Sequence, residues 1–110
     1  MEKSKRRRLE RAGWIVGDAG DFLDLPAEER QFIETKLALA AGLRRRRETL
    51  GLTQTEAAVR VGSSQSRVAK MEAADKSVST DLLLRSLYSL GASRQEVARL
   101  LTPKPRTKAA

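Results

Sequence analysis

The sequence predicts an all-α protein: five short helices in one domain, preceded by an N-terminal extension. Serine, threonine and glycine residues recur at spacings that begin and end helices, and leucines between them fall at helical intervals. No Asn-Gly or Asp-Gly turn joins two alternating β-branched runs, as a β-hairpin would require. The chain has 110 residues, which is enough for one compact domain and too few for two.

The first helix is expected to begin at Pro26, because the fixed φ of proline suits a first helical position. The acidic residues of the PAEER stretch then lie in the opening turn, where the helix dipole favours negative charge. Helix-forming residues continue to Leu50, and Gly51 is a C-terminal stop signal. Gly42 lies inside this run and predicts a weak point in the helix.

The second and third helices are short and closely spaced. Thr53 caps the second helix, and Glu56 lies three residues later, where its side chain completes a capping box. Gly62 ends this helix, because glycine adopts the left-handed conformation that reverses the chain. The serine pair at 63–64 caps the third helix, which runs to about Ala73.

The fourth helix is predicted from a cap at Ser79 to a stop at Gly91. Ser93 and Glu96 form a second capping box, which opens a fifth helix that ends at Leu101. The apolar face of the fourth helix is formed by Leu82, Leu83, Leu87 and Leu90.

The charge balance indicates a polyanionic partner. Lys and Arg number 22 against 14 Asp and Glu, so the net charge is +8. Nucleic acid is favoured over an anionic membrane surface because no strong amphipathic anchor is present. The basic N-terminus is not followed by an apolar stretch, and no apolar run approaches the roughly 20 residues that span a bilayer, so we expect an intracellular protein.

The absence of cysteine and histidine limits the chemistry. Without cysteine the chain forms no disulfide, thiolate nucleophile or zinc finger, and without histidine it lacks the commonest general base and metal ligand. We therefore predict a protein that is not an enzyme and that carries no metal or cofactor.

Charged residues fall in blocks that suggest the domain boundaries. Residues 1–11 are basic, the stretch from Asp18 to Glu34 is acidic, and the remainder is basic again. We assign residues 1–25 to a basic arm with an acidic and apolar extension, residues 26–101 to the helical domain and residues 102–110 to a basic tail. An acidic segment between basic ones suggests two partners of opposite charge.

Residues 50–79 contain the informative motif, two short helices joined by a turn at Gly62. This is the arrangement of a DNA-binding helix-turn-helix. Ala58 is small where two helices approach closely, and the third helix has a polar outer face without acids, as a helix in the major groove requires. That face consists of Gln65, Ser66, Ala69 and Lys70, with Arg67 at its flank.

The stretch TQTEAAVRVGSSQSRVAKME resembles the Xre/Cro family of lambda-repressor-like domains, over roughly residues 36–101. The resemblance implies that Gln54 binds a DNA phosphate, and that Arg67 contacts a base or a phosphate. Ala57 departs from the pattern, since the family usually has leucine there, and suggests compensation by a neighbouring side chain. Arg44 is a candidate for phosphate contact or for plain solubility. The resemblance implies that Gln65, Ser66 and Lys70 reach base edges from the third helix, and Ser64 is a further candidate for DNA contact.

Arg47 and Glu72 are predicted to form a structural ion pair. Arg47 lies in the apolar stripe of the first helix with Leu43 and Leu50, and Glu72 follows Val68 on the inward face of the third helix. Two opposite charges on two buried faces imply a pair, because a lone buried charge costs several kcal/mol. Members of the family resemble this arrangement.

The N-terminal segment GWIVGDAGDFLDLPAEE interleaves apolar and acidic side chains. It either packs across the helical domain as a strap or docks a small basic protein. Together with the helix-turn-helix it resembles antitoxins of the HigA type, which implies a RelE/HigB-like mRNA-cleaving toxin as partner, repression of the shared operon and a place on the bacterial nucleoid in the cytoplasm. The candidate toxin-binding residues are Trp14, Phe22 and Leu23.

The fourth helix has more leucine than one core is expected to bury, which predicts a two-fold dimer through Leu83, Leu84 and Leu87. Such a dimer reads a palindromic operator whose half-sites lie about 34 Å apart. Three alternatives to the antitoxin remain: a stand-alone repressor of phage or mobile-element origin, an RNA-binding protein and a small ribonuclease. The RNA-binding protein is disfavoured by the scarcity of aromatic residues, and the ribonuclease by the lack of a catalytic constellation.

Overall fold

The computed structural model describes residues 24–103, which contain helices and no strand. The all-α class and its five predicted helices are confirmed over this range. The expected toxin-binding residues Trp14, Phe22 and Leu23 lie outside the described residues. The helices are α3 (Ala27–Thr49), α4 (Gln54–Val61), α5 (Gln65–Glu72), α6 (Thr80–Ser89) and α7 (Arg94–Leu101).

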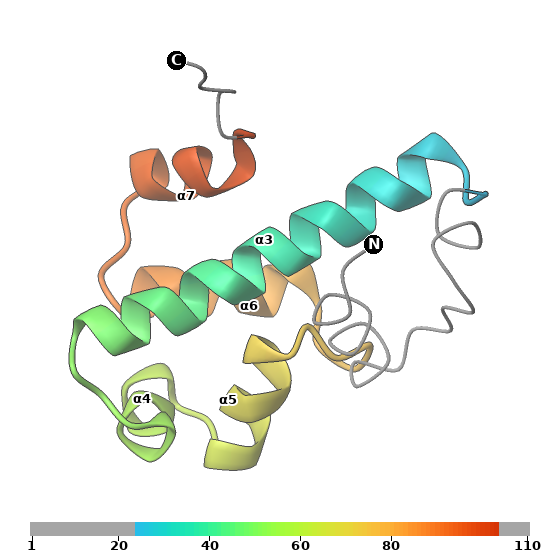
Figure 1. The fold of residues 1–110 in the computed structure, drawn as a ribbon. Coiled ribbons are helices and arrows are strands. Elements are labelled where there is room, and N and C mark those ends of the chain that lie inside the picture. Colours follow the sequence, from blue (N-terminus) through green and yellow to red (C-terminus); the bar gives the residue numbers. More distant parts are fainter. Residues whose placement is uncertain (1–23, 104–110) are drawn as a thin grey trace.

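Helix α3 runs through the middle of the molecule and contacts α5, α6 and α7 (Figure 1). Helix α7 lies on one side of it, and α4 and α5 lie on the other. The face of α3 that packs on its neighbours buries apolar residues at helical spacing, among them Ile33, Leu37, Ala40 and Leu43. The core is completed by residues of every other helix and of the α5–α6 connection, including Ala58, Val68, Met71, Val78, Leu83, Leu87 and Val97.

Gly42, the predicted weak point, does not interrupt α3. The helix is uninterrupted from Ala27 to Thr49, and Gly42 is buried at the point where α7 crosses it. A Cβ atom at this position would overlap the end of the Leu100 side chain. The glycine therefore allows α3 and α7 to approach closely. Helix propensity, on which the prediction of a weak point was based, does not take this contact into account.

The predicted helix caps are present. The Thr53 hydroxyl accepts the backbone N–H of Glu56 at 3.1 Å, and the Glu56 carboxylate accepts the backbone N–H of Thr53 at 2.8 Å. Ser93 and Glu96 repeat this capping box at the start of α7. Ser64, rather than its neighbour in the serine pair, caps α5.

Lys36 is an unexpected buried charge on α3, with 3% of its surface exposed. Burial lowers the pKa of its ammonium group below the ordinary 10.5, and the negative charge of Asp75 acts in the opposite direction. Asp75 belongs to the connection between α5 and α6, so the two charges lie on different parts of the fold.

The prediction of a dimer surface on α6 was wrong for two of its three leucines. Leu83 is 0% exposed and Leu87 is 1% exposed, because α6 packs against α3, α4 and α7 and therefore buries more than one of its faces. Leu84 is half-buried and packs against the same core.

Candidate nucleic-acid interface

Helices α4 and α5 meet at a tight turn that presents α5 on the surface. Gly62 has a φ of 70° and a ψ of 41°, the left-handed conformation expected of it. The backbone N–H of Ser63 then donates to the carbonyl of Ala58 at 2.8 Å, which closes the end of α4. Val68 and Met71 on the inner face of α5 are buried, so the opposite face of this helix points outward.

Ala57, where the sequence departs from the family pattern, is buried beside a narrow apolar void. Val61, Val68 and Met71 also line this void, and it is too small to hold a water molecule. The neighbouring side chains therefore close around the smaller alanine without leaving room for a water molecule.

The outer face of α5 is polar and carries no acid. Ser66 and Arg67 are exposed in the first turn, and Lys70 is exposed one turn later. Within residues 24–103, no side-chain hydrogen bond or ion pair holds Arg67 or Lys70. The Ser64 hydroxyl accepts one backbone N–H at the start of α5, and the helix dipole makes this end favourable for negative charge.

The predicted ion pair between Arg47 and Glu72 joins α3 to α5. Arg47 Nε donates to Glu72 Oε2 at 2.6 Å, and Nη2 donates to Oε1 at 3.0 Å. The side chains are only 13% and 6% exposed, and Arg47 Nη1 also donates to the carbonyl of Leu52 at 2.9 Å. The hydrogen bond to Glu72 raises the pKa of Arg47 further above its ordinary value. The pair fixes the C-terminal end of α5 against α3.

Two glutamines extend this pair to the outer face of α5. Gln54 Nε2 donates to Glu72 Oε1 at 3.1 Å, and Gln65 Nε2 donates to Gln54 Oε1 at 2.7 Å. A continuous chain of hydrogen bonds therefore runs from Arg47 to the first residue of α5. It holds the side chain of Gln65 in one orientation, although that side chain is exposed.

The two glutamines keep hydrogen-bonding capacity after these bonds are made. Each amide nitrogen has two hydrogens and each amide oxygen has two lone pairs. Gln65 retains one N–H and its carbonyl oxygen, the donor and acceptor that pair with an adenine edge in the major groove. Gln54 retains one N–H, which suits the phosphate contact expected of it.

Two other predicted DNA-binding residues have structural partners. The Ser64 hydroxyl accepts the backbone N–H of Arg67 at 3.2 Å and lies 3.3 Å from the hydroxyl of Ser66. Arg44 forms an exposed ion pair with Glu48 at 3.1 Å, one turn along α3, and takes no part in the hydrogen-bond chain that ends at Gln65.

A family model described as a helix-turn-helix domain matches residues 38–100, more than half of the chain. The chain belongs to the helix-turn-helix domain family. The match covers the second half of α3 and nearly all of the chain to the end of α7, so it includes the turn at Gly62 and the polar face of α5. No curated protein and no solved structure matches the chain significantly.

The helix-turn-helix domain is a DNA-binding module, with its second helix presented to the major groove. In residues 24–103, none of the helices combines the length and the hydropathy needed to cross a bilayer. In the same part of the chain, acidic side chains do not gather in a group that could hold a metal ion.

Proposed function

We propose that this protein recognises a specific DNA sequence with α5 and represses transcription there. The observation that carries the proposal is the bonded position of Gln65. Its side chain is exposed for contact, oriented by Gln54 and still able to form the two hydrogen bonds that an adenine edge offers. Ser66 and Lys70 lie beside it on the same exposed face, where we propose that they reach neighbouring bases.

Replacement of Gln65 by alanine tests this assignment. We expect Gln65→Ala to weaken binding to the preferred duplex by about 1–3 kcal/mol, the discrimination supplied by one bidentate contact, with little change for a random duplex. Electrophoretic mobility shifts measure the affinity for a duplex from the region upstream of the protein's own reading frame and the affinity for a random duplex. Gln95→Ala is the matched control, because Gln95 is an exposed glutamine on α7, away from α5. Equal losses on both duplexes would contradict a base-reading role.

We further propose that the protein is an antitoxin of the HigA type that neutralises a RelE/HigB-like toxin and represses its own operon as a dimer. The acidic stretch from Asp18 to Glu34 supports this proposal, because its charge suits a small basic partner. In its described part, the acids Asp24, Glu28, Glu29 and Glu34 are all exposed, around the first half of α3. We propose Trp14, Phe22 and Leu23 as the apolar part of the same contact.

A stand-alone repressor is the second candidate function. It is favoured because the described residues, 24–103, close a core without help from another chain. Co-expression with the product of the neighbouring reading frame separates the two functions. An antitoxin is expected to co-purify with a small basic protein and to suppress its toxicity, whereas no co-purification supports the simple repressor.

A further inference from the structure

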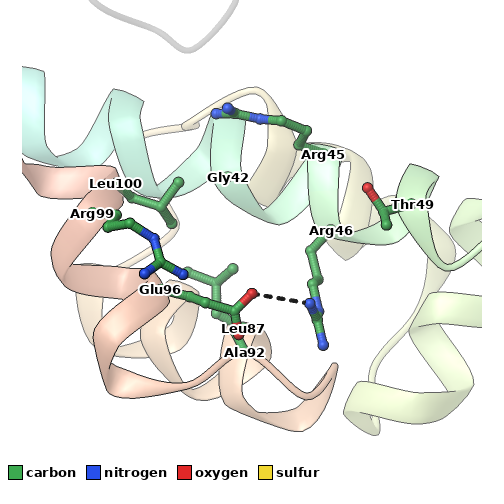
Figure 2. A pocket seen from close by; sticks show the side chains of 9 residues that line it. All are labelled: Gly42, Arg45, Arg46, Thr49, Leu87, Ala92, Glu96, Arg99 and Leu100. Atoms are coloured by element: carbon green, nitrogen blue, oxygen red, sulfur yellow. Dashed lines mark hydrogen bonds and ion pairs between the residues drawn. The ribbon is translucent and has the colours of Figure 1, made fainter. Parts of the chain in front are cut away.

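Helix α7 lies on the opposite side of α3 from α5 (Figure 1), and arginines of both α3 and α7 line the space between these two helices. A pocket of about 350 Å³ opens there between the C-terminal half of α3 and α7. Three arginines line it, Arg45 and Arg46 from α3 and Arg99 from α7, together with the single acid Glu96 (Figure 2). Because α3 separates this pocket from α5, these arginines lie away from the proposed DNA contact.

Both carboxylate oxygens of Glu96, the one acidic residue that lines the pocket, accept hydrogen bonds from the protein. One oxygen of Glu96 accepts the backbone N–H of Ser93 at 2.9 Å, and the other accepts Arg46 Nη1 at 3.2 Å. Arg46 is fixed further by its Nε, which donates to the carbonyl of Leu90 at 3.0 Å. Glu96 therefore pairs directly with Arg46, and its charge also acts on Arg99, which helps to lower the pKa of the Glu96 carboxyl.

Arg45 and Arg99 are left with donors to spare. Neither forms a side-chain hydrogen bond or ion pair with any residue in 24–103, and both are exposed at the edge of the pocket. Three arginines and one glutamate line the pocket, so its net charge is +2. Guanidinium groups bind carboxylate and phosphoryl oxygens by paired, charge-assisted hydrogen bonds.

The rest of the lining is apolar and suits the carbon part of a ligand. Ala92 and Leu100, both half-buried, present carbon atoms to the pocket, and the buried Leu87 lies behind them. The place that a side chain of Gly42 would take is filled by the end of Leu100. Thr49 adds one hydroxyl at the end of the pocket nearest the α3 C-terminus. An inorganic ion would use the arginines alone, whereas a small organic anion would also cover the exposed part of Leu100.

We infer that this pocket binds a small organic molecule carrying two negative charges, either a phosphate monoester or a dicarboxylate. Arg45 and Arg99 bind the anionic groups, and the half-buried Ala92 and Leu100 pack against the carbon skeleton. The inference is independent of the DNA sequence that α5 reads and of any toxin partner.

Titration of the full-length, isotope-labelled protein tests the site. Phenyl phosphate and glutarate serve as the two probes, at constant ionic strength, with backbone amide shifts as the readout. We expect saturable one-to-one binding of at least one probe, with the largest shifts at Gly42, Ala92 and Leu100. The probe that binds more tightly identifies the class of anion.

Two arginine variants of α7 make the test specific. Arg99→Ala is expected to weaken binding by about tenfold or more, as the loss of a charge-assisted hydrogen bond predicts. Arg94→Ala removes the same charge from an exposed residue of the same helix outside the pocket lining, and is expected to leave the affinity unchanged. Both side chains are exposed, and a thermal melt of each variant verifies its fold.

Three results would overturn the inference. They are the absence of saturable shifts with both probes, equal losses in Arg94→Ala and Arg99→Ala, and shifts centred on α5 instead of the pocket. The first denies a site, the second reduces it to general charge attraction, and the third assigns the binding to the DNA-binding face.

Discussion

At the scale of single residues, one ion pair connects stability to recognition. Glu72 accepts hydrogen bonds from both Arg47 and Gln54, and Gln54 in turn orients Gln65. The charges of this pair are buried, so each needs the other to offset its lost hydration. The residue proposed to read DNA is therefore positioned by a pair whose first role is to hold α3 and α5 together.

Removal of Arg47 is expected to destabilise the fold strongly. Arg47→Ala leaves the Glu72 carboxylate buried without its main partner, and we expect a loss of more than about 2 kcal/mol in the free energy of unfolding. Arg44→Ala is the control, because the Arg44–Glu48 pair is exposed and should change stability by less than about 1 kcal/mol. Urea unfolding measures both, and similar small losses would show that the buried pair contributes little.

Gly62 offers a second test at this scale, because only its backbone matters. Nothing lies within 4 Å of a Cβ built at this position, but its φ is +70°. Gly62→Ala should therefore cost about 1–2 kcal/mol from the left-handed backbone alone. Gly62→Asn should cost less, since asparagine tolerates this conformation. The urea unfolding midpoints of the two variants measure these losses. An alanine variant as stable as the parent would contradict a left-handed backbone at Gly62.

At the scale of elements, the short helices depend on their caps. A helix of the length of α4 or α7, 8 residues each, is marginal in isolation, so capping and packing stabilise it. Both begin with a complete capping box, which satisfies two backbone N–H groups that the helix cannot pair internally. The caps also fix where α4 begins, and therefore where Gln54 lies.

The capping boxes predict a loss of stability in acid. Hydrogen bonds from Thr53 lower the pKa of Glu56 below its ordinary 4.5, and those from Ser93, aided by Arg46, lower the pKa of Glu96. A carboxylate with a lowered pKa in the folded state stabilises the fold above its unfolded pKa. This contribution is lost as the pH falls below 4.5 and through the lowered values.

Denaturant unfolding across the acid range measures this effect. The double variant Glu56→Gln with Glu96→Gln should show a weaker dependence of stability on pH than the parent. Glu28→Gln is the control, because Glu28 is an exposed acid in the first turn of α3 that belongs to no capping box. An unchanged slope in the double variant would show that other carboxylates cause the acid sensitivity.

At the scale of the whole molecule, α3 separates two surfaces. Arg47 points from α3 to α5 and the proposed DNA-binding face, whereas its neighbour Arg46 bonds to the α6–α7 turn and Glu96. Successive residues of a helix point in directions about 100° apart, so adjacent arginines serve different sides of the same rod. The four consecutive arginines therefore have different roles. Arg44 forms an exposed ion pair with Glu48, Arg45 and Arg46 line the pocket, and Arg47 forms the buried ion pair with Glu72.

The self-association of the molecule is the remaining prediction at this scale. The proposed repressor is expected to form a two-fold dimer, which would match a palindromic operator, but its contact cannot rely on Leu83 or Leu87. Sedimentation velocity over a range of micromolar concentrations should show a shift from monomer to dimer. A monomer throughout that range, both free and with DNA, would contradict the dimer.

Much of this fold follows from local sequence signals. The capping boxes, the stop at Gly62 and the helical spacing of the apolar residues predicted the helices close to where they lie, because these effects act over three or four residues. The Arg47–Glu72 pair was predicted for a related reason, since a charge in an apolar stripe needs an opposite charge on the facing stripe. The same reasoning would have found Lys36, which shares the α3 stripe with Ile33 and Ala40.

The tertiary structure decided what depends on the arrangement of helices. The α5–α6 connection contains Ala74 in the left-handed region at a φ of 55°, although alanine is no signal for that conformation. The close crossing at Gly42, the burial of Leu83 and Leu87 and the arginine pocket all depend on where α7 and α6 meet α3. Such contacts join residues that are far apart in the chain. Local sequence signals therefore determined where the helices begin and end, whereas only the packing of the helices determined which side chains are buried and which line the surface pocket.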